Sequence, residues 1–386
     1  MRIKKAVVIG AGQAGRGYIG RLLAEIAYEI IFVDKSRTLV DLLHADGHFS
    51  VHFYDKDRTP VIVSDYKALQ IEDAKVDHVI TEADFIFTAT GEQNLSEVAN
   101  RIQKALSKRL TPVVVITCEN GINPGKRLAE ALEEAGGYDK NKIFISQTAE
   151  FCSTVNLVDT RLDILSQNEN FFPYDADGYP GLLEIRGAQP VRNFEEFLKR
   201  KIYTYNCLAG IISYCGYVKG YQVYGEAAND EEVSWLMDVL LKELNPALAK
   251  YFNISEQEQI EFSQKALEKF KNKNILDYII KNGRAPRRKL GPTERIFAPL
   301  RIIEANQGEY DILCFNAAAA LCYWEEQAIH GVEPAMDQPV NKILCEILQV
   351  SEEDQVIKKV NCYLECIRQN RAAISFRAIL NGKLKF

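Results

Sequence analysis

The sequence predicts an α/β domain, with a mostly parallel and doubly wound sheet, followed by an all-helical domain. In the first half of the chain, short apolar runs alternate with stretches of helical periodicity, which is typical of parallel strands joined by helices. After about residue 190, long helical patterns replace them. Because 386 residues exceed what one hydrophobic core usually holds, we expect two domains, residues 1–190 and 191–386, with a boundary between Ile185 and Phe194.

The elements of the first domain follow from its apolar runs. Lys5-Ala6-Val7-Val8-Ile9 ends at Gly10 and is typical of a strand buried on both faces. Residues 16–27 carry an apolar stripe at helical spacing. The same reasoning predicts strands at 29–33, 85–88, 113–117 and 142–146, a helix at about 96–106 and an inserted hairpin at 50–63. Strand–helix–strand repetition implies right-handed crossovers.

The second domain is predicted from helical periodicity alone. Helices are expected at residues 193–214, 230–252, 255–272, 310–329, 340–348 and 352–369. Strand-like runs are almost absent from this half, so we expect it to be entirely helical.

The composition excludes several classes of protein. Lys plus Arg number 47 against 53 Asp plus Glu, and a net charge of −6 argues against a general nucleic-acid binder. No run of about 18 apolar residues exists and the first residues show no signal-peptide pattern, so we expect no membrane partner. The composition leaves the oligomeric state open.

The cysteines predict neither disulfides nor a metal site. Nine cysteines are odd in number and form no C-x-x-C pair, so reduced thiols in a cytoplasmic protein are expected. Cys362 and Cys366 would share a helix face, but no histidine lies near them in sequence, and we predict no bound metal there.

A glycine-rich loop predicts a dinucleotide site. Ile9 closes the first strand, and Gly10-Ala11-Gly12-Gln13-Ala14-Gly15 follows as G-x-G-x-x-G between a strand and a helix. This is the fingerprint of the Rossmann fold. The first glycine permits the turn, the second lets the backbone approach a pyrophosphate, and the third lets the helix pack on the strand. The helix N-terminus offers N–H groups and partial positive charge to the phosphates.

Asp34 favours NAD as the cofactor. It ends the second predicted strand, where a carboxylate can accept hydrogen bonds from both hydroxyls of the adenosine ribose and would repel a 2′-phosphate. Lys35 and Arg37 follow, so NADP stays an alternative. FAD shares the fingerprint, and a glycine turn without a ligand is the remaining interpretation.

Lys201 and Asn206 lie on a predicted helix in the second domain. Five residues span about 140° of an α-helix, so the two side chains could flank a cleft without touching. Oxidation of an alcohol needs a base for the hydroxyl proton, and a lysine serves only when its pKa falls well below the usual range. The alternative interpretation of Lys201 is a solvated surface charge.

A basic segment follows later in the chain. It contains six cations opposed only by Glu294: Lys281, Arg284, Arg287, Arg288, Lys289 and Arg295. Two prolines and a glycine predict a loop rather than a helix face. Arginine forks suit phosphate or carboxylate oxygens, so the segment is either an anion site or a solvated loop.

Collinear motifs over about residues 4–300 resemble the polyol-specific long-chain dehydrogenases (the mannitol dehydrogenase family), and within them the mannitol-1-phosphate 5-dehydrogenases. Lys201 and Asn206 match the first two members of the family signature K-x4-N-x2-H. The other matching stretches are residues 9–20, Thr117-Cys118-Glu119-Asn120-Gly121, residues 213–221, and Arg284 to Leu290 with Arg295 and Pro299-Leu300.

The resemblance implies a Rossmann domain joined to a helical domain, with the active site in the cleft between them. It implies metal-free hydride transfer between NAD and a hexitol phosphate, with a ketose phosphate as the other partner. Lys201 would be the general base and Asn206 would hold the substrate oxygen. Thr88, Thr90, Glu119 and Asn120 are expected near the nicotinamide end of the cofactor, and from its charge we expect the basic segment to bind the phosphate through Arg284, Arg287, Arg288 and Lys289.

Two positions depart from the family pattern. The signature histidine should fall at Ala209, and Val155-Asn156-Leu157 stands where the family usually has Val-Asp-Arg. Alanine cannot hydrogen-bond the reacting oxygen, and Tyr203, Tyr205 or Asn156 are the candidate donors, with Asn156 placed among the substrate-binding residues. Losing one such hydrogen bond typically costs about 100- to 1000-fold in rate. The alternatives are therefore a family enzyme for a sugar acid or an unphosphorylated polyol, and a non-catalytic protein that binds NAD and sugar phosphate.

Overall fold

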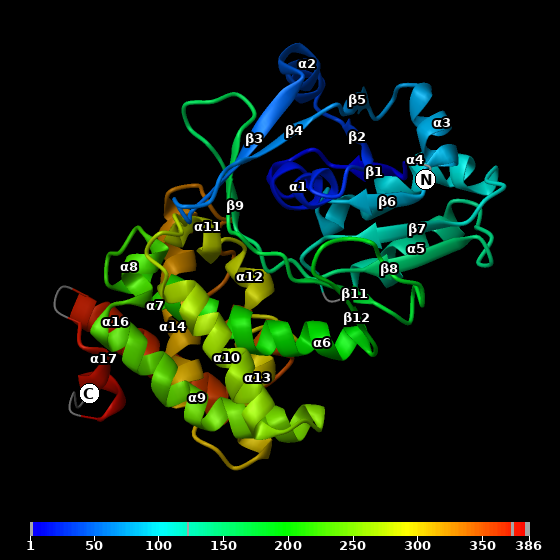
Figure 1. The fold of residues 1–386 in the computed structure, drawn as a ribbon. Coiled ribbons are helices and arrows are strands. Elements are labelled where there is room, and N and C mark those ends of the chain that lie inside the picture. Colours follow the sequence, from blue (N-terminus) through cyan, green and yellow to red (C-terminus); the bar gives the residue numbers. More distant parts are fainter. Residues whose placement is uncertain (1–2, 122, 372–373, 383–386) are drawn as a thin grey trace. The chain divides into compact units, whose positions relative to one another are not determined.

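A computed structural model describes residues 3–121, 123–371 and 374–382. The chain divides into two compact units, Met1–Leu198 and Lys199–Phe386. The first unit is built on a parallel sheet and the second is mostly helical (Figure 1), so the predicted fold class is confirmed. Within the described ranges, no helix combines the length and the apolarity that crossing a bilayer requires.

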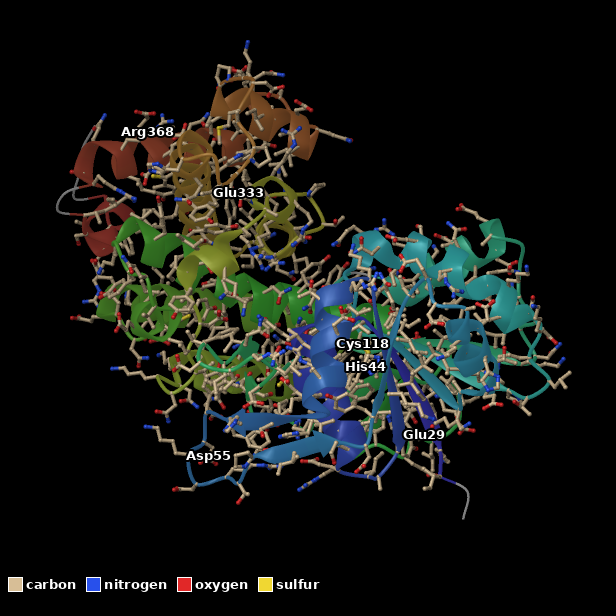
Figure 2. The ribbon with its side chains drawn as sticks, turned by 90° about the horizontal axis from the view of Figure 1, so that it is seen from above. Glu29, His44, Asp55, Cys118, Glu333 and Arg368 are labelled. Carbon is tan, nitrogen blue, oxygen red and sulfur yellow. The ribbon has the colours of Figure 1, made fainter. Side chains whose placement is uncertain are left out.

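A six-stranded sheet forms the centre of the first unit. Its order is β5-β2-β1-β6-β7-β8 and every neighbouring pair is parallel. The strands are β1 (Lys5–Ile9), β2 (Glu29–Asp34), β5 (Lys67–Gln70), β6 (Phe85–Thr88), β7 (Val113–Thr117) and β8 (Ile143–Gln147). Chain order reverses between β1 and β6, the switch point at which open α/β sheets bind ligands. Glu29 and Cys118 mark opposite ends of these strands (Figure 2).

Each face of this sheet is apolar because alternate strand residues point to opposite sides. Val7 and Ile9 pack in one cluster with helices α3 (Lys75–Glu82), α4 (Leu95–Ser107) and α5 (Pro124–Glu134). On the other face, Ala6 and Val8 pack in a cluster that takes in η1 (Gly15–Gly20), α1 (Arg21–Ala24) and α2 (Arg37–Asp46). The helix η2 (Glu92–Asn94) leads into α4.

A second sheet of four strands packs into the same unit. Its order is β4-β3-β10-β9, from β3 (His48–Phe53), β4 (Val61–Ser64), β9 (Thr154–Asn156) and β10 (Ile164–Ser166). The predicted hairpin at 50–63 is confirmed as the antiparallel pair β3–β4. Two further strands, β11 (Phe172–Asp175) and β12 (Ala188–Val191), pair in parallel.

The second unit is a helical assembly around α14 (Asp311–Ile329), which is buried along most of its length and packs against α7 and α16. The helix α6 (Phe194–Lys201) begins in the first unit and ends in the second. The helices that follow it are η3 (Ile202–Asn206), α7 (Cys207–Val218), α8 (Tyr224–Ala228), α9 (Glu231–Phe252), α10 (Glu256–Lys271), α11 (Ile279–Gly283), α12 (Pro286–Lys289), α13 (Phe297–Ala305), α14, α15 (Val340–Leu348), α16 (Gln355–Asn370) and α17 (Phe376–Leu380).

Two predicted helices differ from the structure. The helix expected at 16–27 is a π-helix, η1, followed by the short α1, and it ends at Ala24. Glycines at 15, 17 and 20 disfavour a regular α-helix, and a Cβ on Gly17 would lie 2.4 Å from Ile164 Cγ2, so the close packing of η1 requires a glycine there. The helix expected at 193–214 is interrupted by the π-helical η3.

Candidate active site

The glycine loop lies at the switch point of the first unit. Gly10 has φ +99°, and a Cβ there would lie 2.5 Å from Ala89 O, so the turn needs a glycine. A Cβ on Gly15 would lie 1.9 Å from Gly10 O, so only a glycine lets the helix lie this close to the end of the strand. By contrast, a Cβ on Gly12 would meet open space. Gln13 and Ala14 form the helical turn that precedes η1.

Asp34 is held by backbone donors on both sides of its carboxylate. Ala11 N donates to Asp34 Oδ2 and Ser36 N donates to Asp34 Oδ1, each at 2.8 Å. A carboxylate has about four acceptor positions, so each oxygen can still accept a ribose hydroxyl. These residues fit the adenosine half of a dinucleotide.

A cavity of about 460 Å³ opens beside this carboxylate. Of the residues predicted to bind the cofactor, Ile9, Gly10, Gly12, Asp34 and Thr90 line it. Its other lining residues are Val33, Lys35, Ile71, Glu72, Ala89, Asn94, Glu97, Val98, Asn100 and Arg101. The predicted residues Ala11, Gln13, Ala14, Gly15, Thr88, Glu119 and Asn120 lie outside the lining.

Arg101 is a cavity residue that the sequence analysis missed. Its guanidinium reaches back from α4 to the segment after β5, donating from Nε to Ile71 O at 2.7 Å and from Nη2 to Asp73 O at 3.0 Å, and it pairs with Asp77. Polar residues at helical spacing in α4, directly after the strand β6, were the signal that could have found this wall of the cavity.

Glu119 connects the ends of β6 and β7. Thr88 Oγ1 donates to Glu119 Oε2 at 2.8 Å and Thr90 N donates to Glu119 Oε1 at 3.1 Å. Burial raises the pKa of Glu119, and these hydrogen bonds from Thr88 and Thr90 oppose the rise. Asn120 donates from Nδ2 to Glu150 Oε2 at 3.3 Å. Glu119 therefore fixes the segment 88–90 that borders the cavity.

Asn156 is linked to the glycine loop through Arg16. The buried Arg16 guanidinium donates to Ala11 O and, from Nη2, to Asn156 Oδ1 at 3.2 Å. Burial lowers the pKa of Arg16, and Asp34 is the first of the nearby groups that oppose this. The Asn156 oxygen is thus already engaged, while its Nδ2 group provides a donor at the exposed end of β9.

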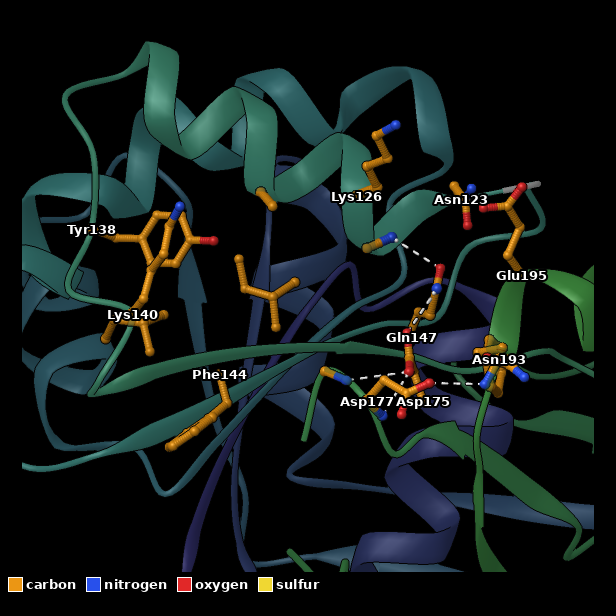
Figure 3. Close-up of a pocket in the computed structure, with 16 residues that line it drawn as sticks. Asn123, Lys126, Tyr138, Lys140, Phe144, Gln147, Asp175, Asp177, Asn193 and Glu195 are labelled. Atoms are coloured by element: carbon orange, nitrogen blue, oxygen red, sulfur yellow. Dashed lines mark hydrogen bonds between the residues drawn. The ribbon is translucent and has the colours of Figure 1, made fainter. Parts of the chain in front are cut away.

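A second cavity of the first unit, of about 570 Å³, lies between α5, β8 and the segment 175–178 (Figure 3). The polar groups at its centre are paired with each other. Gln147 accepts from Gly125 N and donates to Asp175, and Asp177 accepts from Asn193 N. Its lysines, Lys126 and Lys140, are offset by nearby carboxylates, so the cavity has no single charge preference.

The predicted separation of Lys201 and Asn206 is wrong. The α-helical estimate of about 140° does not apply, because η3 is a π-helix in which hydrogen bonds join residues five apart, as between Cys207 N and Ile202 O. Lys201 and Asn206 are therefore stacked on one side of the helix. Lys201 is 9% exposed, so its alternative interpretation as a solvated surface lysine is also wrong. π-Helical turns occur frequently at functional sites.

The helix face around Asn206 is mostly buried. Within residues 201–216, Asn206 and Ala209 are the two positions of intermediate exposure, three residues apart. A histidine at position 209 would therefore lie on the same partly exposed part of the helix as Asn206. Tyr203 and Tyr205, named above as possible replacement donors, are buried.

The basic segment is a loop only in part, and it has more acidic partners than the sequence suggested. Pro286–Lys289 form the short helix α12, because proline is favoured at the first helical position. Glu294 is not the only opposing carboxylate, since Arg287 pairs with Glu346 at 3.2 Å and Lys281 pairs with Asp277 at 3.3 Å.

Of the predicted phosphate ligands, Arg284 and Arg288 lie close enough to Lys289 to interact electrostatically with it, and Arg287 lies apart from them. Arg287 pairs with Glu346, whereas Arg288 pairs with Glu294. Lys289 is buried and donates to Asn282 O, and the exposed Arg284 donates to Lys281 O. Arg295, which the sequence analysis did not place among these ligands, lies beside Arg288 and Lys289.

Two family descriptions match the chain. Residues 4–171 match the "Mannitol dehydrogenase Rossmann domain" and residues 193–376 match the "Mannitol dehydrogenase C-terminal domain". Together these matches span most of both units.

Curated relatives at about 30% identity carry one name. A mannitol-1-phosphate 5-dehydrogenase of Exiguobacterium sp. is 32% identical over 338 residues, which cover 84% of this chain and 86% of that protein. A mannitol-1-phosphate 5-dehydrogenase of Thermoanaerobacter pseudethanolicus is 31% identical over 77% of this chain and 80% of that protein.

Solved structures share the fold. The mannitol 2-dehydrogenase of Pseudomonas fluorescens, in a ternary complex with NAD and D-mannitol, has a TM-score of 0.73 at 15% identity, covering 98% of this chain and 93% of that one. A D-sorbitol dehydrogenase in substrate-free form has a TM-score of 0.72 at 14% identity, covering 97% and 95%. At these identities the likeness concerns the fold alone.

Proposed function

Because the chain belongs to the mannitol dehydrogenase family, we propose that it interconverts a phosphorylated hexitol, such as mannitol 1-phosphate, and the corresponding ketose phosphate with NAD. Members of the family are NAD-dependent polyol dehydrogenases, oxidoreductases that act on a CH–OH group. The observation that carries the phosphorylated substrate is the 32% identity with a mannitol-1-phosphate 5-dehydrogenase over 84% of the chain.

The first unit would bind the cofactor. Asp34 receives the adenosine ribose, and the N–H groups after Gly10 receive the pyrophosphate. When bound, NAD accepts the hydride from the carbon that carries the reacting hydroxyl. Glu119 contributes by holding Thr88 and Thr90 in place beside the cavity.

The second unit would supply the acid–base chemistry. We assign Lys201 Nζ as the base that takes the hydroxyl proton during oxidation and returns it during reduction. A lysine acts as a base when its surroundings disfavour the ammonium form, and Lys201 is 9% exposed. Asn206, stacked on the same side of the helix, would donate from Nδ2 to the substrate oxygen. No step requires a metal, and we propose a cytoplasmic location.

NADH formation across a substrate panel tests this proposal. The panel contains hexitol 1-phosphates, hexitol 6-phosphates, the free hexitols and the corresponding sugar acids, each with NAD and with NADP. We expect turnover with a hexitol phosphate and NAD, and at most a small fraction of that kcat/KM with the free hexitol. Turnover of a sugar acid or a free polyol alone would contradict the phosphorylated substrate while leaving the family activity intact.

Ala209 favours one competing function, a non-catalytic protein that binds NAD and a sugar phosphate. Without the histidine, one hydrogen bond to the reacting oxygen has to come from elsewhere. Calorimetric binding of NAD without turnover of any member of the panel would support this alternative and would contradict the proposed enzyme.

A further inference from the structure

Arg295 is a nearly buried cation whose charge is only partly balanced by one carboxylate, Glu294. It precedes α13, and its side chain is 13% exposed. Nε donates to Glu294 Oε2 at 3.4 Å, and the described part of the chain offers its two terminal nitrogens no acceptor. Burial lowers the pKa of Arg295, with Glu294 the main opposing group. A guanidinium in this position is costly unless an anion completes its hydrogen bonds.

The surroundings of Arg295 carry excess positive charge. Glu294 also pairs with Arg288, so one carboxylate serves two guanidinium groups. Lys289 and Arg284 lie close enough to interact electrostatically with this group. The charges of Arg288 and Arg295 exceed that of Glu294 by one, Arg284 adds further positive charge, and Lys289 can take up a proton. This excess suits a phosphate dianion better than a carboxylate.

Asn316 provides an independent observation. It lies in the middle of α14, it is 0% exposed, and neither Oδ1 nor Nδ2 has a hydrogen-bond partner among the described residues. Buried side-chain amides are nearly always hydrogen-bonded. An amide left with both ends unpaired therefore indicates a polar group that completes the site when it binds.

Arg295 and Asn316 converge on Gly210 of α7. A Cβ on Gly210 would lie 3.2 Å from Asn316 Nδ2 and 3.9 Å from Arg295 Cδ. Gly210 lies four residues after Asn206, so the two share a helix face. Because Gly210 has no side chain, the Asn316 amide and the Arg295 side chain both lie close to the backbone of α7 at this position.

We propose that Arg295 and Asn316 form the binding site for the phosphate group of the substrate. The Arg295 fork would donate to two phosphate oxygens, as guanidinium groups commonly do. Asn316 Nδ2 would donate to a third oxygen, and a polyol hydroxyl would donate to Asn316 Oδ1. This site rests on the proposed function for the identity of the substrate. In it, Arg295 takes the role that the sequence analysis expected of Arg284, Arg287, Arg288 and Lys289.

Binding of inorganic phosphate tests the site without any turnover. Isothermal titration of the full-length protein with phosphate would compare wild type with Arg295→Gln. Hydrogen bonds to charged groups are typically strong enough that losing the fork should raise the Kd for phosphate by roughly 10- to 100-fold. Arg301→Gln is the matched control, because Arg301 lies on α13 and is already paired with Glu304 and Asp354. A Kd for phosphate that Arg295→Gln leaves unchanged, or that Arg301→Gln raises equally, would overturn the proposal.

Two further measurements keep the test decisive. Arg295→Lys keeps the charge without the fork, and it should still raise the Kd for phosphate about tenfold. In wild type, phosphate should slow phenylglyoxal modification of Arg295 but not of Arg301, as mapped by mass spectrometry; an unchanged rate at Arg295 would contradict the site.

If wild type binds phosphate through Arg295 but turns over no hexitol phosphate, the proposed function fails and the anion site stands. If the enzyme turns over hexitol phosphate but its binding of phosphate does not depend on Arg295, the anion site fails and the proposed function stands.

Discussion

Lys289 is an amine placed among cations in the second unit. It is 6% exposed, and its Nζ donates to Asn282 O. Burial, followed by the charges of Arg295 and Arg288, lowers the pKa of Lys289 to about 6, with Arg284 adding to the effect and Glu294 opposing it. At neutral pH the amine is mostly neutral, and an anion bound nearby would favour its protonation.

Replacing Lys289 by methionine should change the pH dependence of stability. Unfolded lysine titrates near 10.5 and folded Lys289 near 6, so between these values the unfolded chain binds more protons and the free energy of unfolding of wild type rises with pH. Methionine does not titrate. The Tm of Lys289→Met relative to wild type should therefore be highest near pH 6 and should decrease toward pH 9.

Differential scanning calorimetry at pH 6, 7.5 and 9 measures this difference. Lys242→Met, at an exposed lysine of α9, is the control and should show the same Tm difference from wild type at each pH. A Tm difference for Lys289→Met that is constant or grows with pH would show that Lys289 does not titrate as described.

At the scale of elements, α4 fixes one wall of the cavity beside Asp34, where we propose that the adenosine half of NAD binds. Arg101 holds the backbone at Ile71 and Asp73, and Ile71 lines the cavity. Without the guanidinium, the segment between β5 and α3 loses these hydrogen bonds. A ligand then has to order this segment when it binds, which costs free energy and weakens binding.

Arg101→Gln should therefore weaken NAD binding by on the order of tenfold without affecting acid–base chemistry. Fluorescence titration would give the Kd for NAD, and kcat at saturating NAD should stay near the wild-type value. Lys104→Gln, an exposed change on the same helix, is the control. Equal Kd values for NAD in Arg101→Gln and wild type would exclude this role of Arg101.

The sequence predicted the elements that local sequence patterns specify. It missed the elements that form only through contacts with residues far away in the chain. The strands around Val7, Phe87 and Val115 are continuous apolar runs, and each is found as predicted. β9 and β10 have only three residues each and pair with each other, and β10 also pairs with β3, about 110 residues earlier in the chain. Neither π-helix could be predicted, because their extra residue per turn is fixed by packing around Gly17 and along α7 rather than by composition.

The same distinction applies to the site. The G-x-G-x-x-G motif and Asp34 are close in sequence, and the Asp34–Ala11 hydrogen bond places them together. Arg295 lies just before α13 and Asn316 lies in α14, and both approach Gly210 of α7. A contact between such separate segments cannot be predicted from a local sequence pattern. A basic residue count suggested Arg287, which the structure pairs with Glu346.

At the scale of the whole molecule, the proposed function would divide the chemistry between the two units. The first carries a dinucleotide fingerprint with a cavity beside Asp34, and the second carries the buried Lys201 and the Arg295 cluster. The net charge is −6, so an anionic substrate gains little from long-range attraction and depends on this local positive charge.

The central claim is that Lys201 is the base for a reaction whose cofactor the first unit holds. The most direct measurement is kcat/KM for hexitol phosphate in Lys201→Ala, together with the Kd for NAD, against Lys265→Ala as an exposed control on α10. We expect a loss of about 10²- to 10⁴-fold in kcat/KM, an unchanged Kd for NAD, and wild-type values for the control. A Lys201→Ala enzyme with wild-type kcat/KM would contradict the claim.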